Sequence, residues 1–165
     1  MVTGPSGVGK GTLISALCRH FPDLRLSVSA TTRPPRSGEE DGHDYHFLSP
    51  EEFERRVQAG EFLEHATYAG NRYGTLKSEV ERPGPVVLEI EVQGARQVRE
   101  ALPEAVQVFI APPSTDVLRD RLIGRGTDSP ETIRARLAQA EEELSAQEEF
   151  QHVVVNDESD RKSVV

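Results

Sequence analysis

The chain has 165 residues, 19 of them Lys or Arg and 28 Asp or Glu, for a formal net charge of −9. This length suits one compact domain, and the acidic balance argues against general nucleic-acid binding, which needs a broad basic face. Because no apolar run approaches the roughly 20 residues of a membrane span and no secretory signal precedes the first motif, we expect a cytoplasmic protein without membrane, nucleic-acid or obligate protein partners.

The first element is a glycine-rich stretch, Gly4-Pro5-Ser6-Gly7-Val8-Gly9-Lys10-Gly11-Thr12, followed by a helical pattern over 12–20. Its glycines let the backbone turn tightly and aim N–H groups at an anion. The helix N-terminus adds partial positive charge, and Lys10 adds a full one. The pattern is that of a phosphate-binding loop, except that Gly11 stands where Ser or Thr is expected and the hydroxyl follows at Thr12. A ligand-free glycine turn is the alternative, but a turn does not need the lysine.

Strand and helix patterns alternate along the rest of the chain. Strands are predicted over residues 24–29, 43–48, 61–68, 86–92, 106–110 and 153–155, and only residues 1–3 can supply a strand before the loop. Helices are predicted over residues 50–59, 94–102, 115–123 and 130–147, with a short one ending near 82. This alternation favours a parallel sheet covered by helices on both faces. Segment 33–83 departs from the rhythm and is interpreted as an inserted subdomain.

Two arginines flank the prolines of a loop near the start of that segment. Arg33 and Arg36 on a stiffened loop suit a doubly charged phosphate, which they can bind through forked hydrogen bonds. Tyr45 and Tyr73 are expected to add hydroxyl donors. The alternative is a solvated arginine pair on an exposed loop.

A second arginine set surrounds the glycine-flanked loop 124–128. Arg121 precedes this loop, Arg125 lies in it and Arg136 follows on the next helix. Such a loop can hinge and bring positive charge over a bound triphosphate. Because phosphoryl transfer depends mainly on positioning and charge neutralisation, converging arginines are what this chemistry needs.

Three glutamates, Glu64, Glu89 and Glu91, fall in predicted strands, where a buried carboxylate needs a partner. A carboxylate can accept from the N1–H and the exocyclic amino group of guanine, whereas adenine presents an acceptor at N1. A hydroxyl such as Thr75 or Ser29 can donate to the guanine O6. A site of this kind rejects the wrong base strongly. The alternative is that these glutamates lie at strand edges in solvent.

Other charged groups are expected to be structural. Arg119 and Arg134 are interpreted as partners in helix-surface ion pairs, and residues 141–143, three consecutive glutamates, as a solvated helix face. The scattered histidines show no metal-ligand spacing. The single cysteine, Cys18, is expected to be a small core residue.

Together these residues resemble the guanylate kinase family, ATP:GMP phosphotransferases of the nucleoside monophosphate kinase fold. The resemblance covers nearly the whole chain, through residues 4–10, 27–39, 42–45, 60–64, 71–75, 88–94, 109–114, 121–127 and 155–157. The loop alone indicates only a nucleotide. The stretch Ser29-Ala30-Thr31-Thr32-Arg33-Pro34-Pro35-Arg36-Ser37-Gly38-Glu39 is far more specific.

The resemblance assigns roles residue by residue. The positions that hold GMP are Ser29, Arg33, Arg36, Tyr45 and Tyr73, with Glu39 steadying the arginine loop. The guanine-reading positions are Glu64, Thr75 and Glu91. The charges on the transferring phosphoryl group are Lys10, Arg33, Arg125 and Arg136, with Arg121 close by. The ATP-binding positions are residues 4–12, Arg125 and Asn156, the last near adenine.

The resemblance also implies an α/β fold of P-loop NTPase type with three parts. These are a core (1–32, 84–123 and 147–165), a GMP-binding subdomain (33–83) and a lid (124–146). ATP and GMP would be the substrates and Mg²⁺ the cofactor, held mainly by phosphate oxygens and water because Gly11 lacks a hydroxyl, with Thr12 as the one candidate protein ligand.

Glu91 is one methylene longer than the Asp often found at this position in the family, and we expect guanine recognition to survive with a small shift. Two other functions stay open. One is a related binding module without catalysis, although such modules typically have a damaged phosphate-binding loop. The other is a kinase for another phosphate acceptor, such as a ribose bisphosphate.

Overall fold

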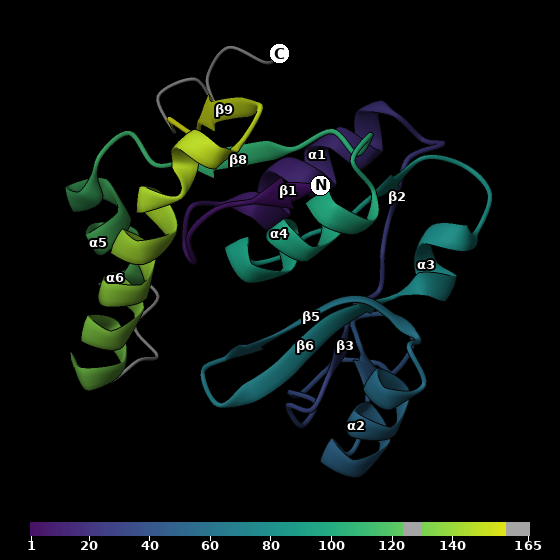
Figure 1. Cartoon of the computed structure of the whole chain (residues 1–165). Helices are drawn as coiled ribbons and strands as arrows, with labels where there is room; N and C mark the ends of the chain where they lie inside the picture. The colour runs from purple at the N-terminus through teal and green to yellow at the C-terminus, as the bar shows by residue number, and fades with distance from the viewer. Residues whose placement is uncertain (124–129, 158–165) are drawn as a thin grey trace.

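The computed structural model describes residues 1–123 and 130–157 (Figure 1). Its core is a parallel sheet in which β8 (Val108–Ala111) lies between β1 (Val2–Thr3) and β9 (His152–Val155). A second parallel pair joins β2 (Arg25–Leu26) to β7 (Val86–Val87). The chain beyond β7 continues beside β1, where the Val2 N–H donates to the carbonyl of Leu88 over 2.8 Å. The two pairings therefore form one continuous layer, which confirms the predicted α/β class.

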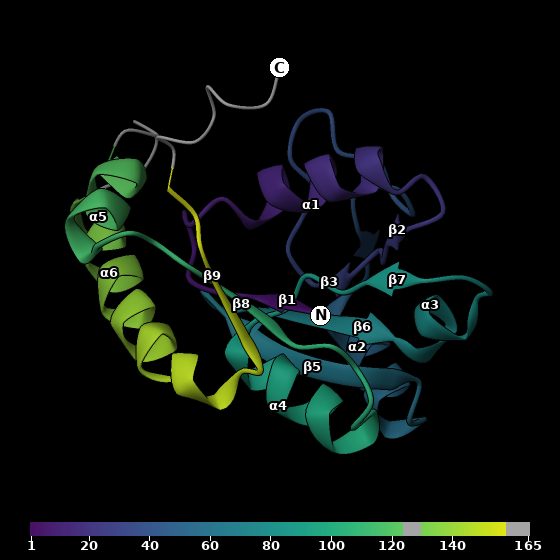
Figure 2. The ribbon, with the colours of Figure 1, turned by 90° about the horizontal axis from the view of Figure 1, so that it is seen from above.

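Helices cover both faces of this layer (Figure 2). The helices α1 (Lys10–His20), α5 (Thr115–Ile123) and α6 (Pro130–Ser145) pack on one face. On the other face lie α4 (Val92–Ala101) and the short 3₁₀ turn η1 (Gln147–Glu149).

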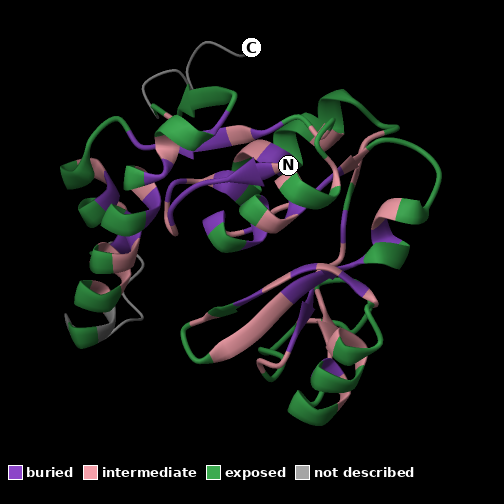
Figure 3. Cartoon of the chain, viewed as in Figure 1, coloured by how far each residue is buried: buried purple, intermediate pink, exposed green. Residues whose placement is uncertain are grey.

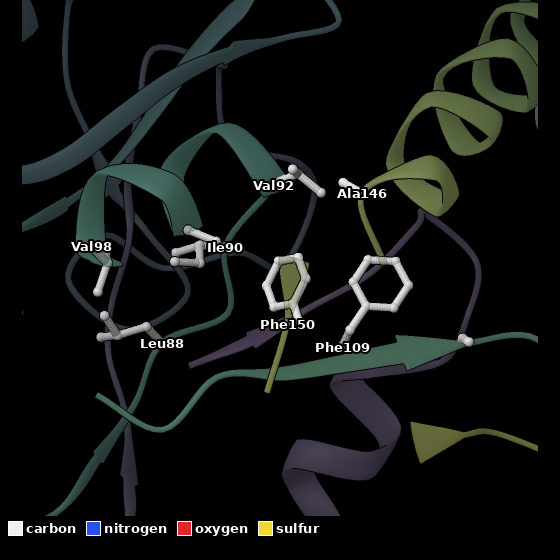
Figure 4. Packing of buried hydrophobic residues seen from close by; sticks show 9 residues of the cluster. Leu88, Ile90, Val92, Val98, Phe109, Ala146 and Phe150 are labelled. Atoms are coloured by element: carbon white, nitrogen blue, oxygen red, sulfur yellow. The ribbon is translucent and has the colours of Figure 1, made fainter. Parts of the chain in front are cut away.

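Neighbouring strand residues supply the two apolar clusters, because successive side chains of a strand point to opposite faces. Phe109 packs with Phe150 and the α4 residues in one cluster (Figure 4), and Ile110 packs with Leu118 and Leu122 in the other. Figure 3 shows buried positions along the core strands and on the inward faces of the helices. Within the described ranges 1–123 and 130–157, no helix has the length and apolar content needed to cross a bilayer.

A second lobe lies below the core in Figure 1. Its four-stranded sheet has the order β4 (His46–Phe47), β3 (Ala30–Thr31), β6 (Asn71–Leu76) and β5 (Phe62–Tyr68). The helix α2 (Pro50–Gln58) packs Phe53 onto Phe62, and α3 (Lys77–Glu81) leads back to the core. The predicted start of α2 is confirmed, because the Ser49 hydroxyl accepts the Glu52 N–H over 3.1 Å.

Several predicted strands have different ends in the structure. The apolar run 86–92 was predicted to be one strand, but β7 ends at Val87, and Glu91 is the N-cap residue of α4. Of the predicted strand 24–29 only residues 25–26 form a strand, β2 of the core, and the next strand, β3, begins at Ala30 and belongs to the second lobe. The predicted subdomain boundary at residue 33 therefore leaves β3 on the core side, although it pairs with β4 and β6. Pairing partners, which no local pattern shows, decide these ends.

Candidate active site

One cavity of about 490 Å³ is lined by residues of the core and the second lobe. The glycine-rich loop contributes Ser6, Gly7, Gly9, Lys10, Gly11 and Thr12. The other predicted site residues in its wall are Ser29, Arg33, Arg36, Glu39, Tyr45, Glu64, Tyr73, Glu91 and Arg136. The fold therefore brings most of the predicted phosphate and base contacts, which are far apart in sequence, to one space.

The glycine-rich loop leads directly into α1. Gly9 is the residue before the helix and has φ +94°, a conformation that L side chains rarely adopt. The Lys10 side chain folds back, and its ammonium donates to the carbonyls of Gly4 (2.5 Å) and Pro5 (3.2 Å). Only 8% of Lys10 is exposed. The loop thus holds a buried cation at the positive end of α1, which is the arrangement that attracts a phosphate chain.

Four predicted ATP-site residues and the predicted phosphoryl-group residue Arg121 are not part of the cavity wall; the four are Gly4, Pro5, Val8 and Asn156. Val8 is buried in the core. Its carbonyl accepts from the Asn156 amide over 2.7 Å and from the Arg121 guanidinium over 3.4 Å, and Arg121 also donates to the Asn156 carbonyl. In this structure Arg121 and Asn156 therefore support the loop backbone. Gly4 and Pro5 contribute carbonyls that accept from the Lys10 ammonium.

The arginine loop is held by one carboxylate. Glu39 accepts from the Arg33 guanidinium over 2.8 Å and from the Arg36 backbone N–H over 2.7 Å. The hydrogen bond from Arg33 lowers the pKa of Glu39, so the pair stays charged. The Arg33 guanidinium also lies over the Tyr45 ring, 5.2 Å from its centre. Glu39 accepts from the guanidinium of Arg33 but only from the backbone N–H of Arg36. Other guanidinium N–H donors of the two arginines therefore remain for an anion at this wall.

A buried carboxylate lines the same cavity as the arginine loop. Only 4% of Glu64 is exposed, and it accepts the Thr75 hydroxyl over 2.7 Å. Burial raises the pKa of Glu64, the hydrogen bond from Thr75 opposes this rise, and the nearby Glu91 adds to it. Thr75 is fully buried and does not line the cavity, so in this structure its hydroxyl orients Glu64.

Gly94 makes room for this carboxylate in the first turn of α4. A Cβ atom on Gly94 would clash with the Glu64 carboxylate. We predict that Gly94→Ala raises KM for the base-bearing substrate about tenfold, since a displacement on the order of 1 Å at a site can cost up to a hundredfold. Alanine's higher helix propensity, about 1 kcal/mol, should offset part of the strain and leave Tm nearly unchanged. The exposed neighbour Gln93→Ala is the control, and an unchanged KM in both variants would contradict this role for Gly94.

Two residues were missed or misassigned by sequence reasoning. Glu143 was expected in a solvated face, but only 7% of it is exposed. Burial and the adjacent carboxyl group of Glu91 raise its pKa to about 9. Its spacing of three from the buried Ala140 was the available signal. Tyr68 was not considered; it lines the cavity at the end of β5 and hydrogen-bonds with Ser6, and burial raises its pKa.

Some predicted features cannot be placed or are placed only in part. Arg125 and the loop 124–128 lie outside the described residues. Arg134 forms the expected helix ion pair, with Glu131 at 3.4 Å. Within the described ranges no group of three or more His, Cys, Asp or Glu side chains could hold a metal ion. Thr12 does lie in the cavity wall.

The parallel sheet, the glycine-rich loop and the buried lysine define a P-loop nucleotide-binding protein. The family model for guanylate kinase matches residues 1–163. The chain belongs to the guanylate kinase family, whose members are nucleoside monophosphate kinases.

Curated relatives and a solved structure agree with this assignment. The chain is 57% identical to a guanylate kinase of Synechococcus sp. (strain CC9311), over 96% of this chain and 85% of the relative. It is 54% identical to a guanylate kinase of Frankia casuarinae, over 96% of this chain and 88% of the relative. The crystal structure of guanylate kinase from Anaplasma phagocytophilum matches 98% of this chain and 77% of that chain, with a TM-score of 0.73 and 34% identity.

Proposed function

We propose that this protein transfers the γ-phosphoryl group of ATP to GMP, giving ADP and GDP. The observation that carries the proposal is the shared cavity, whose wall combines the loop with Lys10, the arginine loop and the buried Glu64. Such a cavity holds a phosphate donor at one wall and a guanine nucleotide at the other. Because both substrates are nucleotides of the cell interior, we also propose a cytoplasmic location.

The acceptor would bind by both of its ends. We propose that Arg33, Arg36, Tyr45 and Tyr73 hold the GMP phosphate, with Glu39 fixing the first two. Glu64 and Glu91 would accept from the guanine N1–H and amino group, and adenine would leave these carboxylates unpaired. Since an unmade hydrogen bond to a buried polar group is costly, this wall discriminates between purines.

The donor would lie along the glycine-rich loop. We propose that Lys10 leaves its loop carbonyls and contacts the β- and γ-phosphates, and that Arg136, from α6, neutralises the transferring group. Arg121 and Asn156 would act by supporting the loop. A GMP phosphate is already a dianion, so the attack needs no general base, and the protein contributes position and charge.

Magnesium is proposed as the cofactor on the chemistry of the donor set. The loop places two hydroxyls in the cavity wall, those of Thr12 and of Ser6, and Ser6 hydrogen-bonds with Tyr68. Oxygen ligands suit Mg²⁺, which keeps several of its waters. Thr12 and the substrate phosphates would therefore hold the ion, which supplies charge neutralisation between phosphate oxygens. The division into a core, a GMP-binding subdomain (33–83) and a lid (124–146) is likewise a proposal, supported by the separate sheet of the second lobe.

The direct test is ADP release from MgATP with GMP, dGMP, AMP, UMP or dTMP as the acceptor. We expect turnover with GMP far above that with AMP, because guanine offers adjacent N1–H and amino donors to the carboxylate wall, whereas adenine presents an acceptor at N1. Turnover with a non-guanine acceptor alone would overturn the assignment of GMP. If no acceptor is phosphorylated but GMP still raises Tm, the chain is a binding module, because a ligand that binds the folded state stabilises it.

A further inference from the structure

Two carboxyl groups from different elements meet beside the base wall. Glu91 precedes α4, and Glu143 lies near the end of α6. In each of them the Oε2 atom is buried from solvent and has no hydrogen-bond partner among the described residues when both carry their charge. Two buried carboxylates in contact repel each other, and neither can donate.

A single proton between the two carboxyl groups removes this repulsion. If Glu143 carries a proton, it donates to Glu91 and leaves Glu91 as the carboxylate that faces the cavity. The environments of the two groups place the proton on Glu143. Only 7% of Glu143 is exposed, whereas Glu91 is half-buried and lines the cavity.

The other groups around Glu143 do not replace this proton. From α1 the ammonium of Lys10 acts on Glu143 at a distance, but its printed hydrogen bonds go to the loop carbonyls. On α6 the Gln139 amide donates to Oε1 over 3.5 Å and leaves Oε2 to Glu91. From β5 the Tyr68 hydroxyl faces the same pair. Arg96 and Glu142 line the adjoining groove at its outer side.

We propose that Glu143 is a positioning residue for guanine recognition: as a neutral acid it donates a hydrogen bond to Glu91 and fixes that carboxylate toward the base. The proposal rests on the proposed role of Glu91 in reading guanine. It accounts for a buried acidic residue on a helix that otherwise presents its glutamates to solvent.

The same contact links the two ends of the substrate. Arg136 and Glu143 are seven residues apart on α6, which places them on one face two turns apart. Arg136 lines the cavity on the phosphate side, and Glu143 reaches the base side through Glu91. One rigid helix therefore contacts the phosphoryl-transfer region and the base-reading carboxylate, and we expect occupancy of the base wall to influence where α6 lies.

The first test measures stability against pH without nucleotide, for wild type, Glu143→Gln and the exposed control Glu142→Gln. An ordinary glutamate loses its proton near pH 4.5, whereas Glu143 in the folded protein holds it up to about pH 9. Below pH 4.5 both states are protonated. As the pH rises toward 9, the unfolded state ionises first, so wild type loses stability. Because the glutamine side chain of the Glu143→Gln variant cannot ionise, the Tm advantage of this variant should grow across the range. An advantage that stays constant with pH, as expected for Glu142→Gln, would overturn the proposal.

The second test separates positioning from packing by steady-state kinetics with GMP and IMP, which lacks the exocyclic amino group. Glu143→Ala should raise KM for GMP about tenfold, the effect of losing one hydrogen-bond partner, with kcat little changed. Its preference for GMP over IMP should fall. Glu143→Gln keeps a hydrogen-bond donor and should therefore retain the wild-type KM for GMP and the wild-type preference for GMP over IMP near neutral pH. Above pH 9 the KM of wild type should rise more steeply than that of Glu143→Gln, because ionisation of the guanine N1–H weakens binding in both proteins, whereas loss of the Glu143 proton acts in wild type alone.

Glu91→Gln distinguishes the two ways in which the idea can fail. If Glu91→Gln lowers the GMP preference and Glu143→Ala does not, Glu91 reads guanine without help and the positioning role is overturned. If Glu91→Gln leaves the preference unchanged, the proposed role of Glu91 is wrong and the positioning role falls with it. Activity with GMP in that variant would show that the proposed phosphoryl transfer itself still stands.

Discussion

Replacing Lys10 with alanine should lower kcat about a thousandfold, the scale measured when one transition-state charge contact is removed. In the ligand-free structure the Lys10 ammonium contacts only its own loop carbonyls among its printed hydrogen-bond partners, so its loss removes little that the fold needs. Tm should change by no more than a few degrees. The measurement is steady-state ADP release with MgATP and GMP, alongside a melting curve.

The matched control for this prediction is Lys77→Ala. Lys77 is exposed at the start of α3 and does not line the cavity. Its removal changes the net charge of the chain by the same amount and should leave kcat unchanged. A Lys10→Ala variant that is folded and has near-normal turnover would remove Lys10 from the mechanism.

Replacing Glu64 with glutamine should reduce kcat/KM for GMP by about a hundred- to a thousandfold and leave the low activity with AMP unaffected. The glutamine side chain keeps one acceptor oxygen for Thr75 but turns an amide donor toward a donor on the base. The preference of GMP over AMP should therefore collapse. Competition kinetics with the two acceptors measure this ratio directly.

Two further observations check the Glu64 prediction. Glu81→Gln, at an exposed position of α3, controls for the change of charge and should keep the preference. Because burial raises the pKa of Glu64, wild type should bind GMP less well as the pH falls, when the carboxyl gains a proton and stops accepting. The Glu64→Gln variant should lack this part of the pH dependence, and an identical acid limb in both proteins would count against Glu64.

The sequence predicted the parts of the site that depend on local geometry. The glycine-rich loop, the Ser49 helix start and the proline-stiffened arginine loop each depend on residues close together, so their pattern is visible in the chain. Glu64 was visible as a glutamate in a predicted strand of the inserted segment, but its contact with Thr75 depends on the pairing of β5 with β6. The close approach of α4 to the Glu64 carboxylate, which Gly94 allows, depends on an element that is distant in the sequence.

The features that local patterns could not reveal depend on tertiary contacts. Glu143 follows two exposed glutamates on α6, and only the packing of α6 against the end of the sheet buries it. The sequence shows that Arg121 is charged but not where its side chain points. In the structure its guanidinium donates to the loop backbone at Val8. The run 86–92 has the composition of a strand throughout, but β7 ends at Val87 and Glu91 is the N-cap residue of α4.

The pairing of β1 has a consequence for how the protein is made. Its two residues lie beside residues 88–90 and pair with Val108 and Phe109, more than 80 positions later. During synthesis the glycine-rich loop emerges first, but the strands that anchor it emerge after the whole second lobe. The nucleotide site therefore cannot assemble before β8, which ends at Ala111, has been synthesised. The inserted lobe, whose strands pair mainly over short sequence distances, can fold before β8, the strand that pairs with β1, has been made.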